Sequence, residues 1–250
     1  MSRKFGMVSM LLGVILASML VFSMVSWAQD AVTNRTGTVR ITKPDGAVLV
    51  VNKDQSLPAI PSGSTIEILE GKADISPVEG FLKVIVSGSA AIVGEGEVIT
   101  AFLDAKTGKA DFAVVTGEIE VISGNTTVKL NGGQEAQVSV NKATGVAEIR
   151  SVKGQIETVT VGVKALIMQG GVAKIDADSK TKKVHVSSVV GELQLISVDG
   201  RTFKVGQGES MESEASATGE IQVFAEGIEM AAPEEEPVEP ERPEASPHRP

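Results

Sequence analysis

Apolar and polar residues alternate along most of the chain between residues 37 and 227. Clear examples are Gly117–Ile122, Thr126–Leu130 and Val184–Val186. Period-two alternation rich in β-branched residues, interrupted by Gly-Asn, Asp-Gly or Thr-Gly pairs, predicts short strands joined by tight turns. Residues 78–232 contain no proline, which suits continuous sheet because proline removes a ladder donor. No segment shows a helical period with caps, so the pattern predicts an all-β protein.

The alternation is organised in a longer period. The string Gly71-Lys72-Ala73-Asp74 returns as Gly108-Lys109-Ala110-Asp111. The glycines Gly80, Gly117, Gly154 and Gly191 are each 37 residues apart. A fixed period in this range predicts a repeat architecture, in which each unit buries its apolar face by stacking on a neighbour. We count about five units from residue 37. The first unit is longer and carries Pro58 and Pro61, as a capping or edge unit would.

Apolar residues keep a constant phase in these units. One set lies two residues after each leading glycine: Val39, Leu82, Ile119, Ile156 and Leu193. A second set lies two residues before the next glycine: Val78, Val115, Val152 and Val189. Both sets are expected to face inward in stacked strands. The constant phase favours a β-solenoid, in which each unit supplies about two coils and the coils stack as parallel strands. A chain of antiparallel β-meanders, or a sandwich, is the alternative.

The two ends of the chain differ from this region. Residues 1–28 combine Arg3 and Lys4, an apolar run and small residues before Gln29, which is the pattern of a secretory signal peptide. An uncleaved signal anchor is the alternative, since the apolar run is just long enough to span a bilayer. We interpret residues 29–36 as a linker and 37–230 as the β-repeat domain. Residues 231–250 are rich in Pro and Glu, which predicts a disordered tail.

Composition narrows the class of protein. The chain carries a net charge of −9, and removal of Arg3 and Lys4 with the signal segment leaves −11. This charge disfavours nucleic acid as a partner because phosphate binding needs concentrated Lys and Arg. The chain has no Cys and no Tyr, and its one Trp lies in the signal segment. A domain of this length without disulfides needs a core, which we expect to consist of Val, Ile, Leu and Ala.

Two strings resemble the FecR domain. The first is Ser62-Gly63-Ser64-Thr65-Ile66 followed by Gly71–Ile75 and Gly80; the second is Val115–Val121 followed by Val128-Lys129-Leu130 and Gly133-Gln134. They are similar to that family's patterns "G-D-x-I … A-x-φ … G" and "V-x-G-x-V-x-V … L-x-x-G-Q". The resemblance covers roughly residues 37–140. It implies an extracytoplasmic, β-rich domain that makes protein–protein contacts and has no catalytic centre. The cytoplasmic sigma-factor segment of the family's iron-uptake regulators has no counterpart before the apolar run.

Few residues offer catalytic chemistry. The histidines are His185, which alternates with valines and is expected on the surface, and His248 in the tail. With no Cys and a single histidine outside the tail, a Ser–His–Asp or Cys–His arrangement or a zinc site lacks residues. Asp176 and Asp178 suggest either a turn or a weak cation site; the glycine and distal glutamate of a calcium loop are missing. We therefore predict no catalytic, cofactor-binding or metal-binding residues and no cofactor.

Carboxylates on one strand face were considered as an acid–base pair. Glu118 and Glu120 share a face, and later units carry Gln155 with Glu157 and Glu192 with Gln194 at these positions. A polar face repeated in every unit is typical of solvent exposure, and no Trp or Tyr remains in the domain to stack on a sugar. A polysaccharide-binding or polysaccharide-cleaving role is therefore the weakest hypothesis.

The sequence leads to one main functional hypothesis and one alternative. The main hypothesis is a non-enzymatic, exported module, periplasmic or secreted, that binds unidentified proteins of a bacterial cell envelope or acts as a scaffold. The alternative is a structural component that self-associates, since solenoid ends propagate when they are not capped. Contact with the membrane is expected only if the signal segment stays uncleaved.

Overall fold

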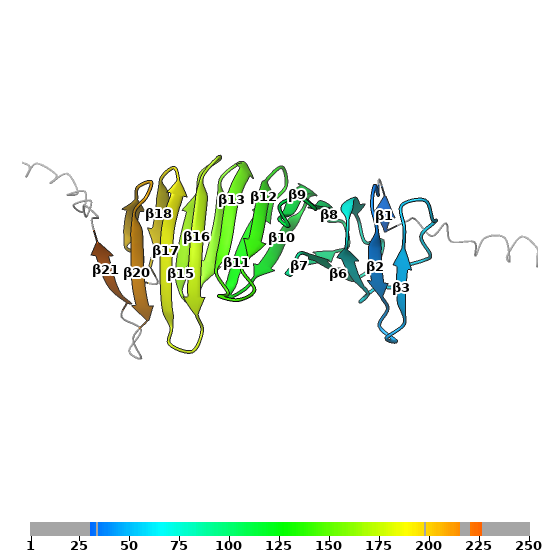
Figure 1. The fold of residues 1–250 in the computed structure, drawn as a ribbon, viewed down its shortest axis with the longest axis horizontal. Helices are drawn as coiled ribbons and strands as arrows, with labels where there is room; N and C mark the ends of the chain where they lie inside the picture. Colours follow the sequence, from blue (N-terminus) through cyan, green and yellow to red (C-terminus); the bar gives the residue numbers. More distant parts are fainter. Residues whose placement is uncertain (1–30, 34, 198, 216–220, 227–250) are drawn as a thin grey trace, which may run out of the picture.

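The computed structural model describes residues 31–33, 35–197, 199–215 and 221–226. In these ranges all regular elements are β-strands, β1 to β21, and they form two large sheets in an elongated body (Figure 1). The prediction of an all-β protein is confirmed. The predicted signal peptide (1–28) and tail (231–250) lie outside the described residues.

Sheet A has ten strands in the order β1-β5-β8-β9-β12-β13-β16-β17-β20-β21. Their bounds are β1 Val32–Thr33, β5 Gly71–Ile75, β8 Val98–Leu103, β9 Ala110–Thr116, β12 Glu135–Val140, β13 Ala147–Lys153, β16 Val172–Asp178, β17 Lys183–Val190, β20 Ser210–Ala215 and β21 Ile221–Glu226.

Sheet B has eleven strands in the order β19-β18-β15-β14-β11-β10-β7-β6-β4-β2-β3. Their bounds are β2 Val39–Thr42, β3 Val48–Val51, β4 Thr65–Ile68, β6 Phe81–Val86, β7 Ser89–Gly94, β10 Glu118–Ser123, β11 Thr126–Asn131, β14 Ile156–Thr160, β15 Val163–Ile167, β18 Leu193–Ile196 and β19 Thr202–Val205.

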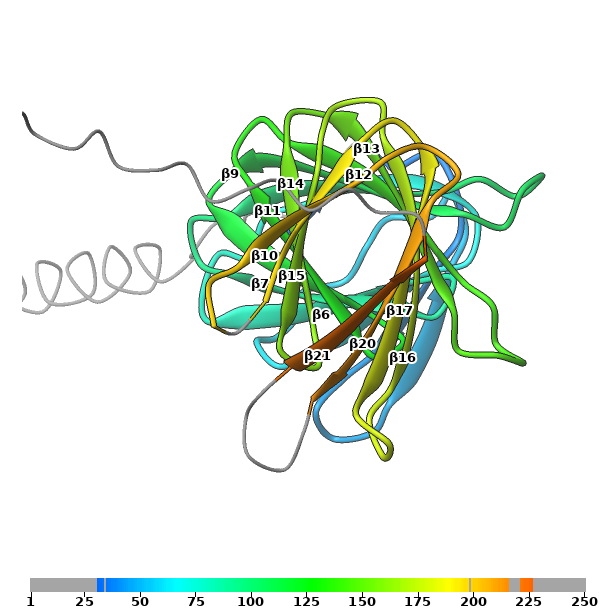
Figure 2. The same cartoon turned by 90° about the vertical axis from the view of Figure 1, so that its left-hand side faces the viewer.

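From β6 onward the chain is a series of hairpins that alternate between the sheets. The hairpin β6–β7 lies in sheet B, β8–β9 in sheet A, β10–β11 in sheet B, and so on to β20–β21 in sheet A. Each 37-residue interval thus adds one hairpin to each sheet. Along the long axis the hairpins lie behind one another (Figure 2).

The expected parallel stacking of solenoid coils is wrong for the described strands, of which only β4 and β6 pair in parallel. The short turns explain the antiparallel pairing. Ser87 and Gly88 both have positive φ (51° and 87°) and form a two-residue loop between β6 and β7. Such loops match the twist of adjacent antiparallel strands. Of the antiparallel alternatives, the chain of meanders also needs correction, because each unit is divided between two sheets rather than forming one meander.

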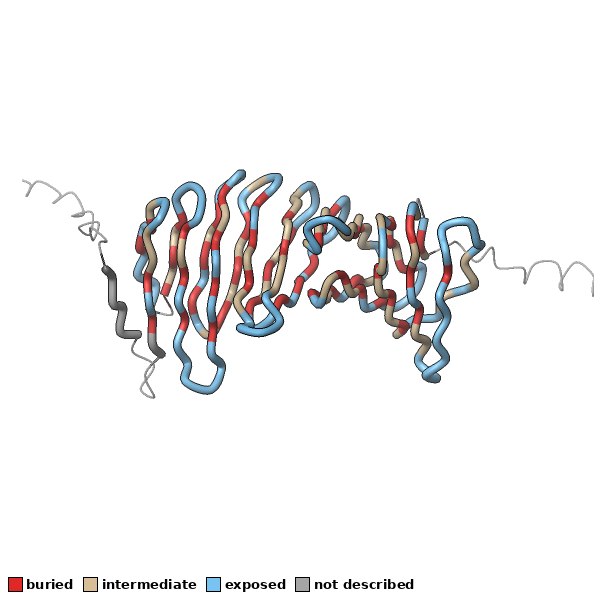
Figure 3. The backbone as a smooth tube through the Cα atoms, in the orientation of Figure 1, coloured by how far each residue is buried: buried red, intermediate tan, exposed pale blue. Residues whose placement is uncertain are grey.

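The core lies between the inner faces of the sheets, and residues that are buried alternate with less buried ones along most of the strands whose burial is described (Figure 3). The first in-phase set, Val39, Leu82, Ile119, Ile156 and Leu193, is buried as predicted. The core is mainly Val, Ile, Leu and Ala, with a few larger residues. Of these, Phe112 is completely buried, and its cross-strand neighbours are Ala101 and Ala136. Their small side chains leave room for the phenyl ring.

The predicted linker, residues 29–36, contains a strand of sheet A. Val32 in β1 is buried and pairs with Ile75 of β5. Arg35 donates hydrogen bonds from its guanidinium group to the carbonyl oxygens of Val51 (2.8 Å) and Gln55 (2.6 Å). The folded domain therefore begins before residue 37. The alternation that identified other strands could not identify β1, because this strand has only two residues.

Candidate functional site

The second in-phase set of valines is on the surface, which contradicts the expectation that it faces inward. Val115, Val152 and Val189 are exposed by 61%, 39% and 38%, and Val78, in the loop after β5, by 52%. We call Val115, Val152 and Val189 the valine row. The residues before them, Val114, Ser151 and Ser188, are buried.

Each valine of the row lies at a β-bulge. In β8–β9, Ile99 pairs with Val114 and Val98 with Thr116, so Val115 has no cross-strand partner. The same register shift leaves out Val152 in β12–β13 and Val189 in β16–β17. A bulge inserts one unpaired residue into the ladder. Each valine follows a buried residue and is turned outward by the alternation of its strand, and at the bulge the next residue stays outward as well.

Backbone hydrogen bonds hold the bulges in place. The N–H of Val114 donates to the carbonyl of Gln134 (2.9 Å), and the N–H of Gly133 donates to the carbonyl of Val114 (2.7 Å). Ser151 bonds in the same way to Gly171 and Gly170, and Ser188 to Glu209 and Gly208, at 2.8–3.0 Å. Each valine thus follows a residue that is fixed on both backbone groups.

The valine row extends along the molecule. It comes from β9, β13 and β17, which are separated by two positions each in sheet A. Neighbouring strands lie about 4.8 Å apart, so successive valines are about 10 Å apart across the strands. Val190, beside Val189, is also exposed. The result is a periodic series of apolar side chains at one end of the sheet A strands.

The carboxylates considered as an acid–base pair lie on the outer face of sheet B, and Glu118 and Glu120 are both exposed. Three outer-face glutamates each lie near a lysine of the same hairpin: Glu120–Lys129 at 3.5 Å, Glu157–Lys164 at 3.4 Å and Glu192–Lys204 at 3.4 Å. Ion pairs at exposed positions contribute about 0–1 kcal/mol. This arrangement is that of a solvated face, as the repeated polar pattern predicted.

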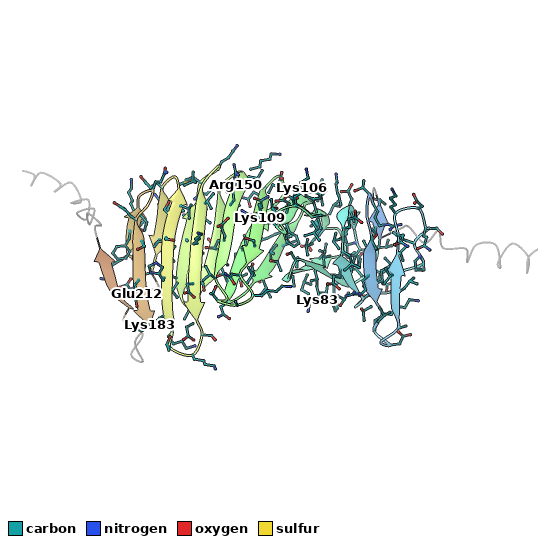
Figure 4. All side chains as sticks on the ribbon, in the orientation of Figure 1. Lys83, Lys106, Lys109, Arg150, Lys183 and Glu212 are labelled. Atoms are coloured by element: carbon teal, nitrogen blue, oxygen red, sulfur yellow. The ribbon has the colours of Figure 1, made fainter. Side chains whose placement is uncertain are left out.

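A polar groove of about 370 Å³ lies on the outer face of sheet A, lined by Asp176, Asp178, Thr181, Lys183, His185 and Glu212. His185 is exposed, as expected, and its cross-strand partners are Asp176 and Glu212. Lys183 Nζ lies 3.5 Å from Glu212 Oε1; both residues are labelled in Figure 4. In the part of the chain that the structure describes, no three His, Asp or Glu side chains are grouped to hold a metal ion.

Asp178 stabilises a turn. Its Oδ1 accepts hydrogen bonds from the N–H groups of Lys180 (2.8 Å) and Thr181 (3.3 Å). These bonds, led by that from Lys180, lower the pKa of Asp178. Asp104 and Asn141 accept equivalent bonds in the two preceding hairpin loops of sheet A. Of the two interpretations of Asp178, this contact pattern matches the turn; Asp176 lies outside the loop, exposed on β16.

Sequence reasoning therefore missed the bulges and the meeting of Asp176, His185 and Glu212. A signal for the bulges was present. Ala110, Phe112 and Val114 alternate as buried residues of β9, the same alternation turns Val115 outward, and Thr116, just before Gly117, breaks it by staying exposed. The groove had no such signal, because strand pairing alone brings Glu212 beside His185.

No family model, curated protein or solved structure matches this chain. Among the described residues, no helix has the length and apolar character needed to cross a membrane.

Proposed function

We propose that this protein is a non-enzymatic, exported β-repeat module that binds other proteins of the cell envelope. In this proposal the 37-residue hairpin pairs are structural repeats of a solenoid-like body, and the valine row is the binding surface. The observation that carries the proposal is the exposure of an unpaired valine at a β-bulge in three successive units.

Two physical arguments support the valine row as a binding surface. Exposed apolar side chains grouped on one surface are typical of interaction sites, whereas single ones need no explanation. The row also stands on backbone that is hydrogen-bonded on both sides. A rigid surface loses little conformational entropy on binding, so more of the contact energy remains as affinity.

Features of the sequence support a location outside the cytoplasm. The signal-like segment, residues 1–28, favours export to the periplasm or beyond, and the resemblance to the FecR domain favours protein–protein contacts outside the cytoplasm. The acidic surface, with a net charge of −9 for the whole chain, favours proteins over nucleic acids as partners.

The test compares two sets of substitutions in the full chain. The first changes Val115, Val152 and Val189 to Thr, which keeps the β-branched shape but adds a hydroxyl group. The matched control changes Ile92 and Ile122 to Thr; these are exposed by 49% and 52% but lie on sheet B. Because both sets are exposed, we expect wild-type circular dichroism spectra for both.

Partners are recovered by crosslinking in the native envelope and affinity purification. We expect the valine variant to recover the wild-type partners at least tenfold less, and the control to recover them normally. Equal recovery by both variants would overturn the valine row as the binding surface. A parallel arm removes residues 233–250; recovery of the same partners without this segment excludes it as the binding element.

A further inference from the structure

Sheet B ends in edge strands at both ends of the elongated body. At one end, β3 pairs with β2, and at the other, β19 pairs with β18; the sheet order places no further described strand beyond either. Val48, Leu49 and Val50 of β3 are exposed by 61%, 41% and 47%. Leu49 lies across from Ile41, which is completely buried, so Leu49 is on the inner face of the sheet but only partly covered.

The two edges have complementary directions. Neighbouring strands in sheet B are antiparallel except for β4 and β6, so β3 and β19 run in opposite directions. In sheet A all neighbours are antiparallel, and with ten strands its end strands β1 and β21 also run in opposite directions. A second copy displaced along the long axis, without rotation, would therefore add an antiparallel strand to both sheets. If β4 and β6 were also antiparallel, the two edge strands of the eleven-stranded sheet B would run in the same direction.

From this geometry we propose that the sheet ends bind a second copy of this chain head to tail, with β3 of one copy pairing with β19 of the next. The inference rests on the proposed function as an interaction module and names a partner for its ends. Both strands have four residues. Leu49 and Val51 would extend the inner face that Phe203 and Val205 form in the neighbouring copy.

The backbone of β3 offers donors and acceptors for this pairing. Lys43 N–H donates to the carbonyl of Ala47 (2.9 Å), at the start of the β2–β3 pair. Because hydrogen-bonded and non-bonded pairs alternate in an antiparallel ladder, the N–H and C=O groups of Val48 and Val50 are directed to the open edge. The strand itself contains no Lys, Pro or bulge, the features with which monomeric proteins protect an edge.

Part of the core at this end of the molecule is covered by the segment that follows β3. Residues 52–60 follow β3, and their side chains Leu57 and Ile60 pack against the core. Arg35 holds this segment through the carbonyls of Lys53 and Gln55. Head-to-tail contact would therefore use the strand edge rather than an open core. Such a contact joins two different surfaces and does not close on itself, so it produces linear chains.

The first experiment measures the mass of the purified full chain by size-exclusion chromatography with light scattering over a range of concentrations. We expect a ladder of species in steps of one chain, 26.0 kDa for the full sequence. The substitution Val50→Pro removes the N–H on the open edge and spares the bonds to β2. It should raise the dissociation constant at least tenfold. Val48→Lys combined with Val50→Lys tests the same edge with charge if the proline variant fails to fold.

A mixing experiment tests the two-surface arrangement. A Val50→Pro copy still offers its β19, so it should end a growing chain and shorten wild-type assemblies when mixed with them. A crosslink gives the location: the chain has no Cys, so Val50→Cys with Lys204→Cys should form intermolecular ladders with a short bismaleimide. The matched pair Val50→Cys with Ile92→Cys should not.

The proposal is overturned if the full chain stays monomeric up to on the order of 1 mM, or if assemblies form but Val50→Pro leaves their mass unchanged. Equal crosslinking of the two cysteine pairs would also overturn it. These outcomes are separable from the proposed function, because Val50→Pro leaves the valine row intact and should still recover envelope partners.

Discussion

Replacement of Phe112 by Ala tests the assignment of the core. The Phe112 side chain is completely buried, and its cross-strand neighbours Ala101 and Ala136 carry only methyl groups on hydrogen-bonded strands. These neighbours cannot fill the space that the ring leaves. Phe→Ala at such sites costs about 3–5 kcal/mol, the sum of lost transfer energy and the cavity. Because the cross-strand neighbours on both sides of Phe112 are alanines, we expect Phe112→Ala to lower the free energy of unfolding by about 4 kcal/mol.

The matched control is Phe81→Ala, which makes the same chemical change at a side chain that is 49% exposed. At this position the substitution loses only about half of the transfer free energy of a buried ring and leaves little cavity. The expected loss of unfolding free energy is therefore about 1 kcal/mol. The assay is urea unfolding followed by far-UV circular dichroism, since the only Trp lies outside the described residues. With a slope of about 2 kcal/mol/M, the midpoint should fall by about 2 M for Phe112→Ala and by about 0.5 M for Phe81→Ala. Equal shifts for the two variants would refute the reasoning.

Two further predictions concern a turn and a half-buried carboxylate. Lys182 has a φ of 60°, and the equivalent positions of the two preceding sheet A loops are Gly108 and Gly145. Because a residue with a Cβ is strained at positive φ, Lys182→Gly should raise the melting temperature by about 2–4 °C. The control Lys180→Gly in the same loop should not raise it. Burial raises the pKa of Asp111, and its Oδ1 has no hydrogen-bond partner. The folded state therefore holds this proton to higher pH than the unfolded state, and its contribution to stability is lost as pH rises through the folded pKa. Asp111→Asn should remove that loss, so the urea midpoint of the variant relative to that of wild type should be higher at pH 7 than at pH 4; a relative midpoint that does not change with pH would contradict the assignment.

Local patterns allowed the strands to be predicted from sequence. Val39, Leu82, Ile119, Ile156 and Leu193 were expected inside and are buried. Such predictions succeed because side-chain direction in a strand depends only on alternation along that strand. The composition of the core followed equally directly, since Val, Ile, Leu and Ala are the apolar residues that this chain has in quantity.

Only part of the candidate site could be predicted from the sequence. The sequence revealed the period of Val115, Val152 and Val189, but their constant phase relative to the glycines predicted that they face inward, which is wrong. A bulge depends on the partner strand as well: Val115 leaves the ladder because Val114 bonds to the turn before β12. The groove beside His185 likewise needed the pairing of β17 with β20.

The sequence by itself determined that this protein is all-β, where most strands lie, and which types of residue form its core. Only the tertiary structure decided that the hairpins alternate between two sheets, that one pair, β4–β6, is parallel, and that three valines leave the core. The physical reason is the range of the interactions. Alternation and turn preferences act between residues close in sequence, whereas strand partners and bulges depend on hydrogen bonds between distant segments.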